Sequence, residues 1–256
     1  MSDKNNIIEP IDISNAHFQV ALVTDDLAKT LPSNVTMPCY CVMMNGSPLK
    51  TPQGKSIVYQ DETALRQMVS EFGSMSKLDV HEISLYSLYS NQKDLIELNR
   101  EEFLLDESEI YNALLRDNAL ITEMGPTFGD HKAIVEKFLN TNGLKFPYSI
   151  QYKGTRESEI NVVNLVFFVR DSIANFSMPQ LTVYVNLVSC FDSYILALMI
   201  TLGMITLEEF SVAYLDCKGI GEKWGDTLQE EKQQKQQVTE YIIIVTKYLR
   251  YFSGKS

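Results

Sequence analysis

The first part of the chain alternates short apolar runs with turn residues, a pattern typical of a small β-sheet. Residues 18–23 and 39–44 are short β-branched or aromatic runs, and residues 55–59 form a third. Asn45-Gly46 is the favoured pair for a tight hairpin, because both central positions need positive φ. A second turn is expected at Pro52-Gln53-Gly54. The pattern therefore predicts a sheet joined by short turns.

An amphipathic helix is expected directly after this sheet. Asp61 can cap it, and the apolar positions Leu65, Met68, Val69 and Phe72 follow at helical spacing. Gly73 is the expected end of the helix. Its apolar face should lie on the sheet.

The pattern changes beyond this helix. Residues 107–120 and 132–139 are helical in pattern, with few strand signals between them. The dense apolar run at 162–170 suits a strand as well as a helix, because its β-branched content is high.

The last part of the chain predicts long helices. Residues 181–204 are apolar on most faces, with Pro179 in the first turn and Gly203 at the end, as expected of one helix at the centre of a bundle. Thr206 can cap a following helix, and residues 229–252 become amphipathic after a polar start. We therefore expect an α+β protein with two domains: a small β-rich domain with a packed helix at residues 1–82, and an all-α orthogonal helical bundle at residues 83–256.

Charge and composition exclude some functions. A hydrophobic share of 45% in 256 residues is that of a globular chain that buries a core. The net charge of −11 argues against a nucleic-acid partner, because phosphate binding depends on clustered Lys and Arg.

Targeting and membrane signals are not evident. Residues 1–6 are polar and include an acid, unlike a signal or transit peptide, so we expect the chain to work where it is made. The apolar stretch 181–207 carries Asn186, Ser189, Asp192 and Ser193 near its middle, which favours a buried helix over an integral membrane segment.

Candidate catalytic and metal-binding groups are scattered. Cys39, Cys41, Cys190 and Cys217 form no CxxC pair, and His17, His81 and His131 lack ligand neighbours at metal spacing. Neither a G-x-S-x-G elbow nor a P-loop is present. We therefore expect no metal, no cofactor, no small-molecule substrate and no enzymatic activity.

The glycine-rich stretch 219–225 resembles a phosphate loop at first sight. Its third glycine is one position late and a helix precedes it, so a helix-to-helix turn is favoured. Trp224 lies in this stretch, where it either packs on the helix pair, the interpretation that we favour, or anchors an interface.

Several segments, taken in order, resemble the assembly chaperones of the ATP synthase alpha subunit from mitochondria and alphaproteobacteria. The resemblance covers nearly the whole chain. In the first part of the chain it is carried by the strand and turn at Tyr40–Gly54, which include Leu49-Lys50-Thr51-Pro52, by Glu71-Phe72, where the family has Glu-Trp, and by Leu85–Leu88. In the later part it is carried by Arg116–Leu120, which includes Asp117, by Ser193–Glu209 and by Glu222-Lys223-Trp224-Gly225.

The resemblance implies stoichiometric binding to the free alpha subunit without nucleotide hydrolysis. It implies contacts near the helix-pair turn, for which we select Asp216, Glu222, Trp224 and Asp226 by position, with Thr51 and Pro52 fixing the sheet turn. The expected compartment is the bacterial cytoplasm, or the mitochondrial matrix if a transit peptide precedes this chain. An enzyme on an unrecognised α+β scaffold that uses carboxylates, and a membrane-peripheral module, are the alternatives.

Overall fold

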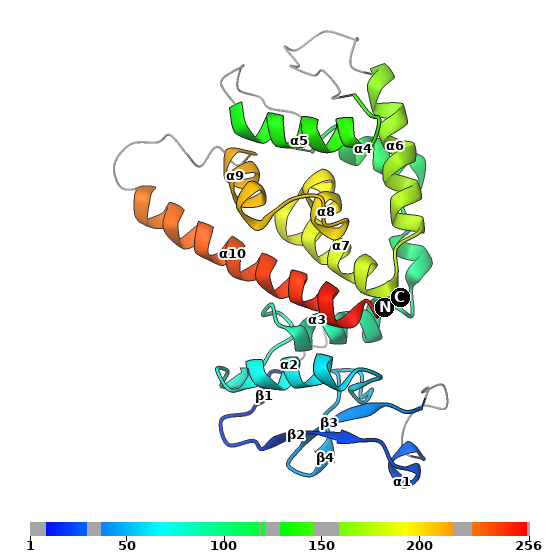
Figure 1. The fold of residues 1–256 in the computed structure, drawn as a ribbon, viewed down its shortest axis with the longest axis vertical. Coiled ribbons are helices and arrows are strands. Elements are labelled where there is room, and N and C mark those ends of the chain that lie inside the picture. Colours follow the sequence, from blue (N-terminus) through cyan, green and yellow to red (C-terminus); the bar gives the residue numbers. More distant parts are fainter. Residues whose placement is uncertain are drawn as a thin grey trace, which may run out of the picture. The chain divides into compact units, whose positions relative to one another are not determined.

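The chain forms two compact units in a computed structural model that describes residues 9–29, 37–117, 119–120, 129–145, 159–217 and 227–254. Unit 1 comprises Met1–Asn99 with Lys247–Ser256, and unit 2 comprises Arg100–Thr246. The structure thus divides the chain after Asn99 and after Thr246, whereas the sequence pattern places one boundary after residue 82. The mixed content confirms the predicted α+β class: small antiparallel sheets in unit 1 and helices in unit 2 (Figure 1).

The elements of unit 1 follow one another closely, and helix α10 spans the boundary between the units. Unit 1 contains β1 (Ile11–Asp12), β2 (Phe18–Leu22), α1 (Asp25–Ala28), β3 (Tyr40–Met44), β4 (Ser47–Pro48), β5 (Val58–Tyr59), α2 (Glu62–Phe72), β6 (Lys77–Leu78), α3 (Leu85–Asn91), the π-helix η1 (Gln92–Ile96) and the end of α10 (Thr227–Phe252).

Strand β3 is the centre of the main sheet. It pairs antiparallel with β2 over five consecutive residues, from Phe18 opposite Met44 to Leu22 opposite Tyr40, and its other side pairs with β4 and β5. Asn45 and Gly46 have φ of 50° and 82°, which confirms the predicted hairpin turn. Strand β3 is buried at Cys41 and Val42 because it has neighbours on both sides.

Helix α2 lies on this sheet as the apolar spacing predicts. The Asp61 carboxylate accepts a hydrogen bond from the backbone N–H of Thr63 at 2.8 Å and so caps the helix. Leu65, Met68 and Phe72 are buried, and the rings of Phe72 and Phe18 lie 4.7 Å apart. This packing ties α2 to β2.

All the secondary-structure elements that the structure describes in unit 2 are helices. Unit 2 contains the 3₁₀-helix η2 (Arg100–Phe103), α4 (Glu107–Leu114), α5 (Gly129–Thr141), α6 (Glu159–Ala174), α7 (Met178–Phe191), α8 (Tyr194–Thr201), α9 (Leu207–Cys217) and the larger part of α10.

Two helix predictions need correction. The pattern at 107–120 predicts a helix to residue 120, but α4 ends at Leu114. Beyond this end, the Asp117 carboxylate accepts a hydrogen bond from the Ala119 N–H at 2.9 Å. The single helix predicted at 181–204 is two helices. Asp192 adopts the left-handed conformation at the end of α7, and the Ser193 side chain accepts from the Leu196 N–H to start α8.

The run at 162–170, which the sequence leaves open between strand and helix, is part of helix α6. Other predictions for unit 2 are confirmed: α5 includes residues 132–139. Pro179 lies in the first turn of α7, and Thr206 precedes α9. Helix α10 buries one face, as expected of an amphipathic helix; its buried residues are Val238, Ile242, Val245, Tyr248 and Phe252. Within the described ranges, we find no helix with both the length and the apolar character that crossing a membrane requires.

Candidate functional site

The predicted turn residue Thr51 lies in a polar clamp inside unit 1. Thr51 is buried, and its hydroxyl donates to Oδ1 of Asp94 at 2.8 Å while accepting from the Lys55 N–H at 3.2 Å. The Gln53 N–H donates to the other oxygen of Asp94 at 3.1 Å. Pro52, between Thr51 and Gln53 in the sequence, is half-buried. A single carboxylate therefore binds the turn segment at two positions, Thr51 and Gln53.

Asp94 comes from η1, so the clamp joins a helix to the sheet turn. Lys55 places its Nζ 3.8 Å from Oδ1 of Asp94 and donates to the Lys93 carbonyl. The Asp94 side chain is buried, where an ionised carboxylate is tolerated only with such partners. Sequence reasoning missed Asp94, because nothing local in a polar stretch marks which acid points inward.

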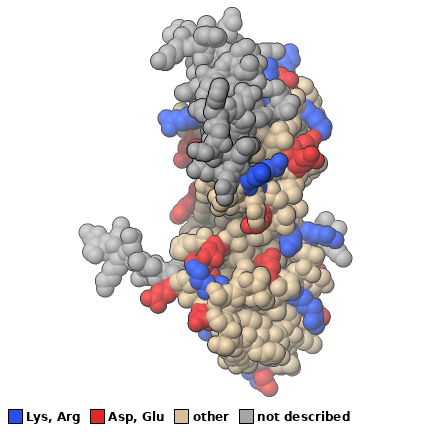
Figure 2. Space-filling model, turned by 90° about the vertical axis from the view of Figure 1, so that its left-hand side faces the viewer, with Lys and Arg blue, Asp and Glu red and all other residues tan. Residues whose placement is uncertain are grey.

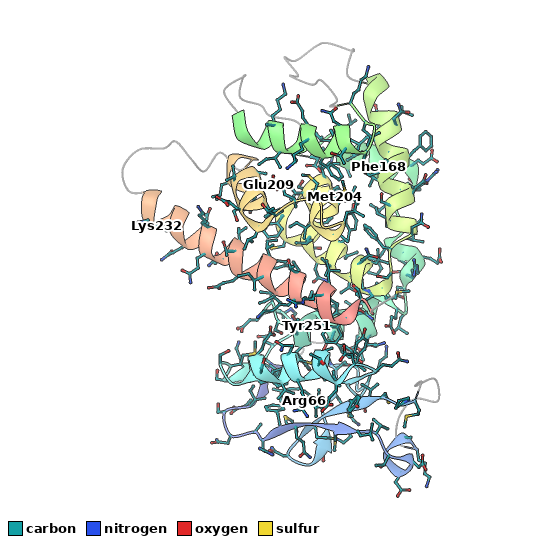
Figure 3. The ribbon with its side chains drawn as sticks, viewed as in Figure 1. Arg66, Phe168, Met204, Glu209, Lys232 and Tyr251 are labelled. Carbon is teal, nitrogen blue, oxygen red and sulfur yellow. The ribbon has the colours of Figure 1, made fainter. Side chains whose placement is uncertain are left out.

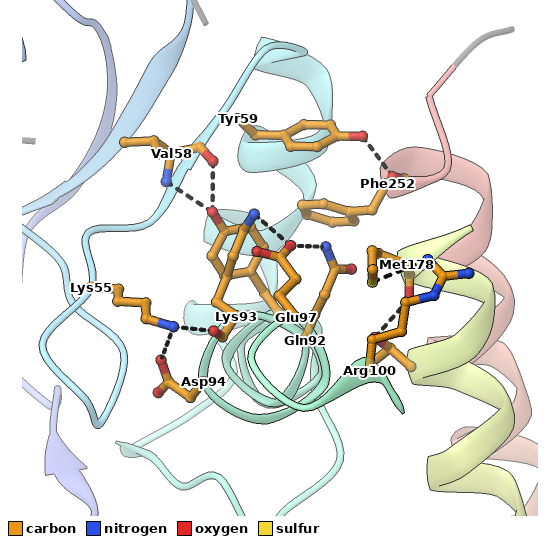
Figure 4. A network of polar contacts seen from close by, with 12 residues as sticks. Lys55, Val58, Tyr59, Gln92, Lys93, Asp94, Glu97, Arg100, Met178 and Phe252 are labelled. Carbon is orange, nitrogen blue, oxygen red and sulfur yellow. Dashed lines mark hydrogen bonds and ion pairs between the residues drawn. The ribbon is translucent and has the colours of Figure 1, made fainter. Parts of the chain in front are cut away.

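The end of α10 completes unit 1 through aromatic side chains. Tyr248 is fully buried and donates to Oε1 of Gln92 at 2.7 Å, and the Phe252 carbonyl accepts from the Tyr59 hydroxyl at 2.6 Å (Figure 4). The Phe252 ring lies 4.7 Å from Tyr248 and 5.8 Å from Tyr89. Burial raises the pKa of the Tyr248 hydroxyl well above its ordinary value, so this group remains a donor.

A second buried carboxylate, Asp117, organises unit 2. Its Oδ1 accepts from the Ser193 hydroxyl at 2.8 Å and its Oδ2 from the Ile195 N–H at 2.9 Å. Burial raises the pKa of Asp117, while the hydrogen bonds oppose that shift. Asp117 therefore caps the start of α8, together with Ser193.

The junction between α8 and α9 precedes the segment that holds the predicted contact residues. Gly203 has φ of 67°, and the Met204 N–H returns to the Met199 carbonyl at 2.8 Å, which closes the end of α8. Thr206 and Glu209 then form a capping box, because the Thr206 N–H donates to Glu209 at 2.9 Å and the Glu209 N–H donates to the Thr206 hydroxyl at 3.1 Å.

Glu209 also reaches a neighbouring helix. Lys137 of α5 donates to its carboxylate at 3.0 Å. The Thr206 N–H and Lys137 together hold the pKa of Glu209 below its ordinary value. Figure 3 shows Glu209 on α9, close to the connection that carries Met204. These contacts cap the start of α9 and link it to α5.

Aromatic rings tie α9 to α7 and α10. The Phe191 ring lies 5.1 Å from Phe210, 4.8 Å from Tyr214 and 5.2 Å from Tyr241. The Tyr241 hydroxyl donates to the Asn186 carbonyl at 3.1 Å. Helices α8 and α9 thus lie between α5 and the unit-2 part of α10 (Figure 1).

Three of the four predicted contact residues lie outside the described residues: Glu222, Trp224 and Asp226. Asp216 is in α9, but its side chain is outside the described part as well. The four residues are therefore not brought together in what the structure describes, and their contact role stays a prediction.

Unit 2 also exposes an apolar helix face. Val163 and Phe167, one turn apart on α6, are 45% and 40% exposed. The Arg170 guanidinium lies 5.1 Å from the Phe167 ring centroid and pairs with Glu107 and with Asp171. A protein partner with an apolar surface could be held at this face.

The described residues contain no cluster of side chains that would bind a metal ion. Within the described ranges, no three His, Cys, Asp or Glu side chains group as metal ligands would. Lys and Arg side chains lie among Asp and Glu side chains on the face drawn in Figure 2. Surface charge therefore points to no particular ligand.

The architecture defines an α+β protein with a small sheet unit and a helical unit, and this fold occurs in known structures. One is the crystal structure of Atp12 from Paracoccus denitrificans, with a TM-score of 0.60 and 12% identity over 92% of this chain and 94% of that chain. A mutant of that protein aligns with a TM-score of 0.58.

Another is a protein from Agrobacterium tumefaciens proposed to be a chaperone, with a TM-score of 0.61 and 16% identity over 91% of this chain and 83% of that chain. No family model matches the sequence, and no curated protein matches it. The likeness therefore shows the fold of the chain.

Proposed function

We propose that this chain is an assembly chaperone of the F-type ATP synthase, which binds the free alpha subunit and prevents its aggregation until the beta subunit takes it over. The observation that carries the proposal is the likeness to Atp12, an ATP synthase assembly chaperone, over nearly the full length of both chains. The ordered sequence motifs lead to the same family by a separate route.

A contact between two of those motifs supports the proposal. Asp117 belongs to the segment Arg116–Leu120 and Ser193 begins the segment Ser193–Glu209, and the two side chains hydrogen-bond at 2.8 Å. Motifs that resemble the family at separate places in the sequence thus meet in the core of unit 2. This is expected if they preserve one fold for one task.

The proposed mechanism is shielding without chemistry. An unassembled subunit exposes a large apolar interface, which aggregates unless a partner covers it. The apolar face of α6, with Val163 and Phe167, is one described surface that could cover such an interface. The acidic surplus of the chain would steer a partner that has basic groups, and moderate affinity would let the beta subunit displace the chaperone.

The proposed contact residues are Asp216, near the end of α9, and Glu222, Trp224 and Asp226, which follow this helix in the sequence. The capping box at Thr206 and the aromatic cluster around Phe191 hold the described part of α9 in place. We propose that the protein acts in the bacterial cytoplasm and uses no cofactor.

Co-expression with the alpha subunit of the same organism tests this proposal. The alpha subunit is expected to stay soluble and to co-purify with the chain, and aggregation at the level of an empty vector would refute the function. Glu222→Lys and Trp224→Ala should each reduce capture by at least about tenfold, as loss of an interface anchor does. Glu101→Lys, at an exposed position of unit 2, is the matched charge control and should capture normally.

A further inference from the structure

Strand β2 forms an edge of the main sheet. Its pairing with β3 fixes the direction of every backbone group, because hydrogen-bonded and non-bonded positions alternate in an antiparallel pair. The Val23 N–H donates to the Cys39 carbonyl at 2.9 Å, and the His17 carbonyl accepts from the Asn45 N–H at 2.9 Å. Residues 17, 19, 21 and 23 therefore face β3.

The backbone N–H and C=O groups of Phe18, Val20 and Leu22 consequently point away from β3. No strand in the described part of the chain pairs with this side of β2. The pairing has no bulge, since five consecutive residues are in register. The edge is thus straight and ready to accept another strand.

Protein edge strands usually carry a device that prevents such pairing, such as a Lys, a Pro or a bulge. Strand β2 reads Phe-Gln-Val-Ala-Leu and has none of these. Leu22 leaves 54% of its surface exposed. On the face drawn in Figure 2, the lower end of the molecule is mostly uncharged. An unguarded edge of this kind is expected where a partner strand binds.

We propose that the open edge of β2 binds an extended segment of the unassembled protein partner by strand addition. This inference rests on the proposed chaperone function and names a second contact for it, in unit 1. The backbone groups of Phe18, Val20 and Leu22 form the ladder. The side chains of these residues share one face, on which Phe18 packs against Phe72 and Leu22 stays open to the partner's apolar side chains.

Charge selects the kind of segment that binds. Asp25 and Asp26 follow β2 directly and are exposed, with the Asp26 side chain 94% accessible even though Lys29 pairs with it. A bound segment should therefore carry alternating apolar residues and a basic residue at the end beside these acids. A second copy of this chain fits poorly, because each copy carries a net charge of −11.

A proline substitution tests the ladder without touching the sheet itself. Val20→Pro removes one outward N–H and leaves the bonds to β3 in place, and proline is tolerated at the outward positions of an edge strand. Val20→Ile is the matched control, since it keeps the N–H. We expect Val20→Pro to bind the alpha subunit about tenfold more weakly than Val20→Ile. Leu22→Lys, which leaves the backbone unchanged, should weaken binding as well.

Hydrogen exchange on the unsubstituted protein gives a readout that does not depend on any variant. Adding the alpha subunit should slow exchange at the amides of Phe18, Val20 and Leu22. If the alpha subunit binds, yet these amides stay unprotected and Val20→Pro binds like Val20→Ile, the edge inference is wrong and the chaperone function stands. If the alpha subunit does not bind at all, the proposed function itself fails.

Two further outcomes would also overturn strand addition. Protection of the three amides in the protein alone would mean that the chain covers its own edge. A dimer that Val20→Pro dissociates, with alpha-subunit binding unchanged, would identify a second copy as the occupant.

Discussion

The hydroxyl of Ser193 donates to the carboxylate of Asp117 at 2.8 Å, across 76 positions of sequence. The same carboxylate accepts the backbone N–H of Ile195, so it holds the first turn of α8 as well as the residue that caps it. Because α9 follows α8 directly in the chain, this buried acid fixes the point at which the α8–α9 helix pair begins.

Replacing Asp117 with alanine should destabilise the protein strongly. The change leaves the buried donors of Ser193, Ile195 and Ala119 without their acceptor, and the expected loss is about 3 kcal/mol in the free energy of unfolding. Urea denaturation followed by circular dichroism measures it. Glu208→Ala, at an exposed position, is the control and should change stability by less than about 0.5 kcal/mol. Equal effects of the two changes would contradict the capping role.

Glu209 should make stability depend on pH. The pKa of Glu209 is lower in the folded protein than its ordinary value of 4.5, so its stabilisation is present above pH 4.5 and is lost as the pH falls through the folded pKa. Glu209→Gln should therefore cost about 0.5–1 kcal/mol at pH 7 and much less at pH 3. Unfolding curves at both values, with Glu208→Gln as the neighbouring control, measure the difference. A cost that is the same at both values would show that ionisation of Glu209 does not matter.

The Thr51 hydroxyl should contribute more to the stability of the protein than the Pro52 ring does. Thr51→Val keeps the shape of the side chain but removes both the donor to Asp94 and the acceptor for Lys55, which should cost about 2 kcal/mol. Pro52→Ala removes no hydrogen bond and should cost less than about 1 kcal/mol. Thermal unfolding ranks the two variants. The reverse order would mean that the ring, and not the clamp by Asp94, fixes the turn.

Two buried tyrosines should respond in opposite ways to loss of the hydroxyl. The Tyr184 hydroxyl has no hydrogen-bond partner within the described residues, so Tyr184→Phe should leave stability unchanged or raise it by about 1 kcal/mol. Tyr248→Phe removes the 2.7 Å bond to Gln92 and should lower stability by about 1–2 kcal/mol. Each variant is the control for the other in the same denaturation experiment. A clear loss for Tyr184→Phe would reveal a partner for its hydroxyl.

Local signals predicted the elements that depend on neighbours in sequence. Asn45-Gly46, Asp61 and Pro179 each act through groups a few residues away, so the hairpin, the cap of α2 and the start of α7 could be predicted. The break at Asp192 was missed because the apolar run continues on both sides of it. A single left-handed residue followed by a capping serine is a weak signal within so apolar a stretch.

Long-range pairings could not be predicted. Asp94 and Asp117 are ordinary acids in the sequence, and only the fold reveals that they are buried and which donors they meet. The proposed contact residues came from the resemblance and not from any physical signal, and the described residues do not bring them together. The sequence also could not predict that β2 is an edge strand, because this depends on which strands pair with it in the fold.

Because the end of α10 belongs to unit 1, the two units can be completed only at different stages of synthesis. The side chains of Tyr248 and Phe252 fill unit 1, yet the ribosome makes all of Arg100–Thr246 before it reaches them. A nascent chain therefore holds an incomplete sheet unit while the helical unit can already close. The sheet unit, with its open edge, becomes complete only after the helical unit has been translated.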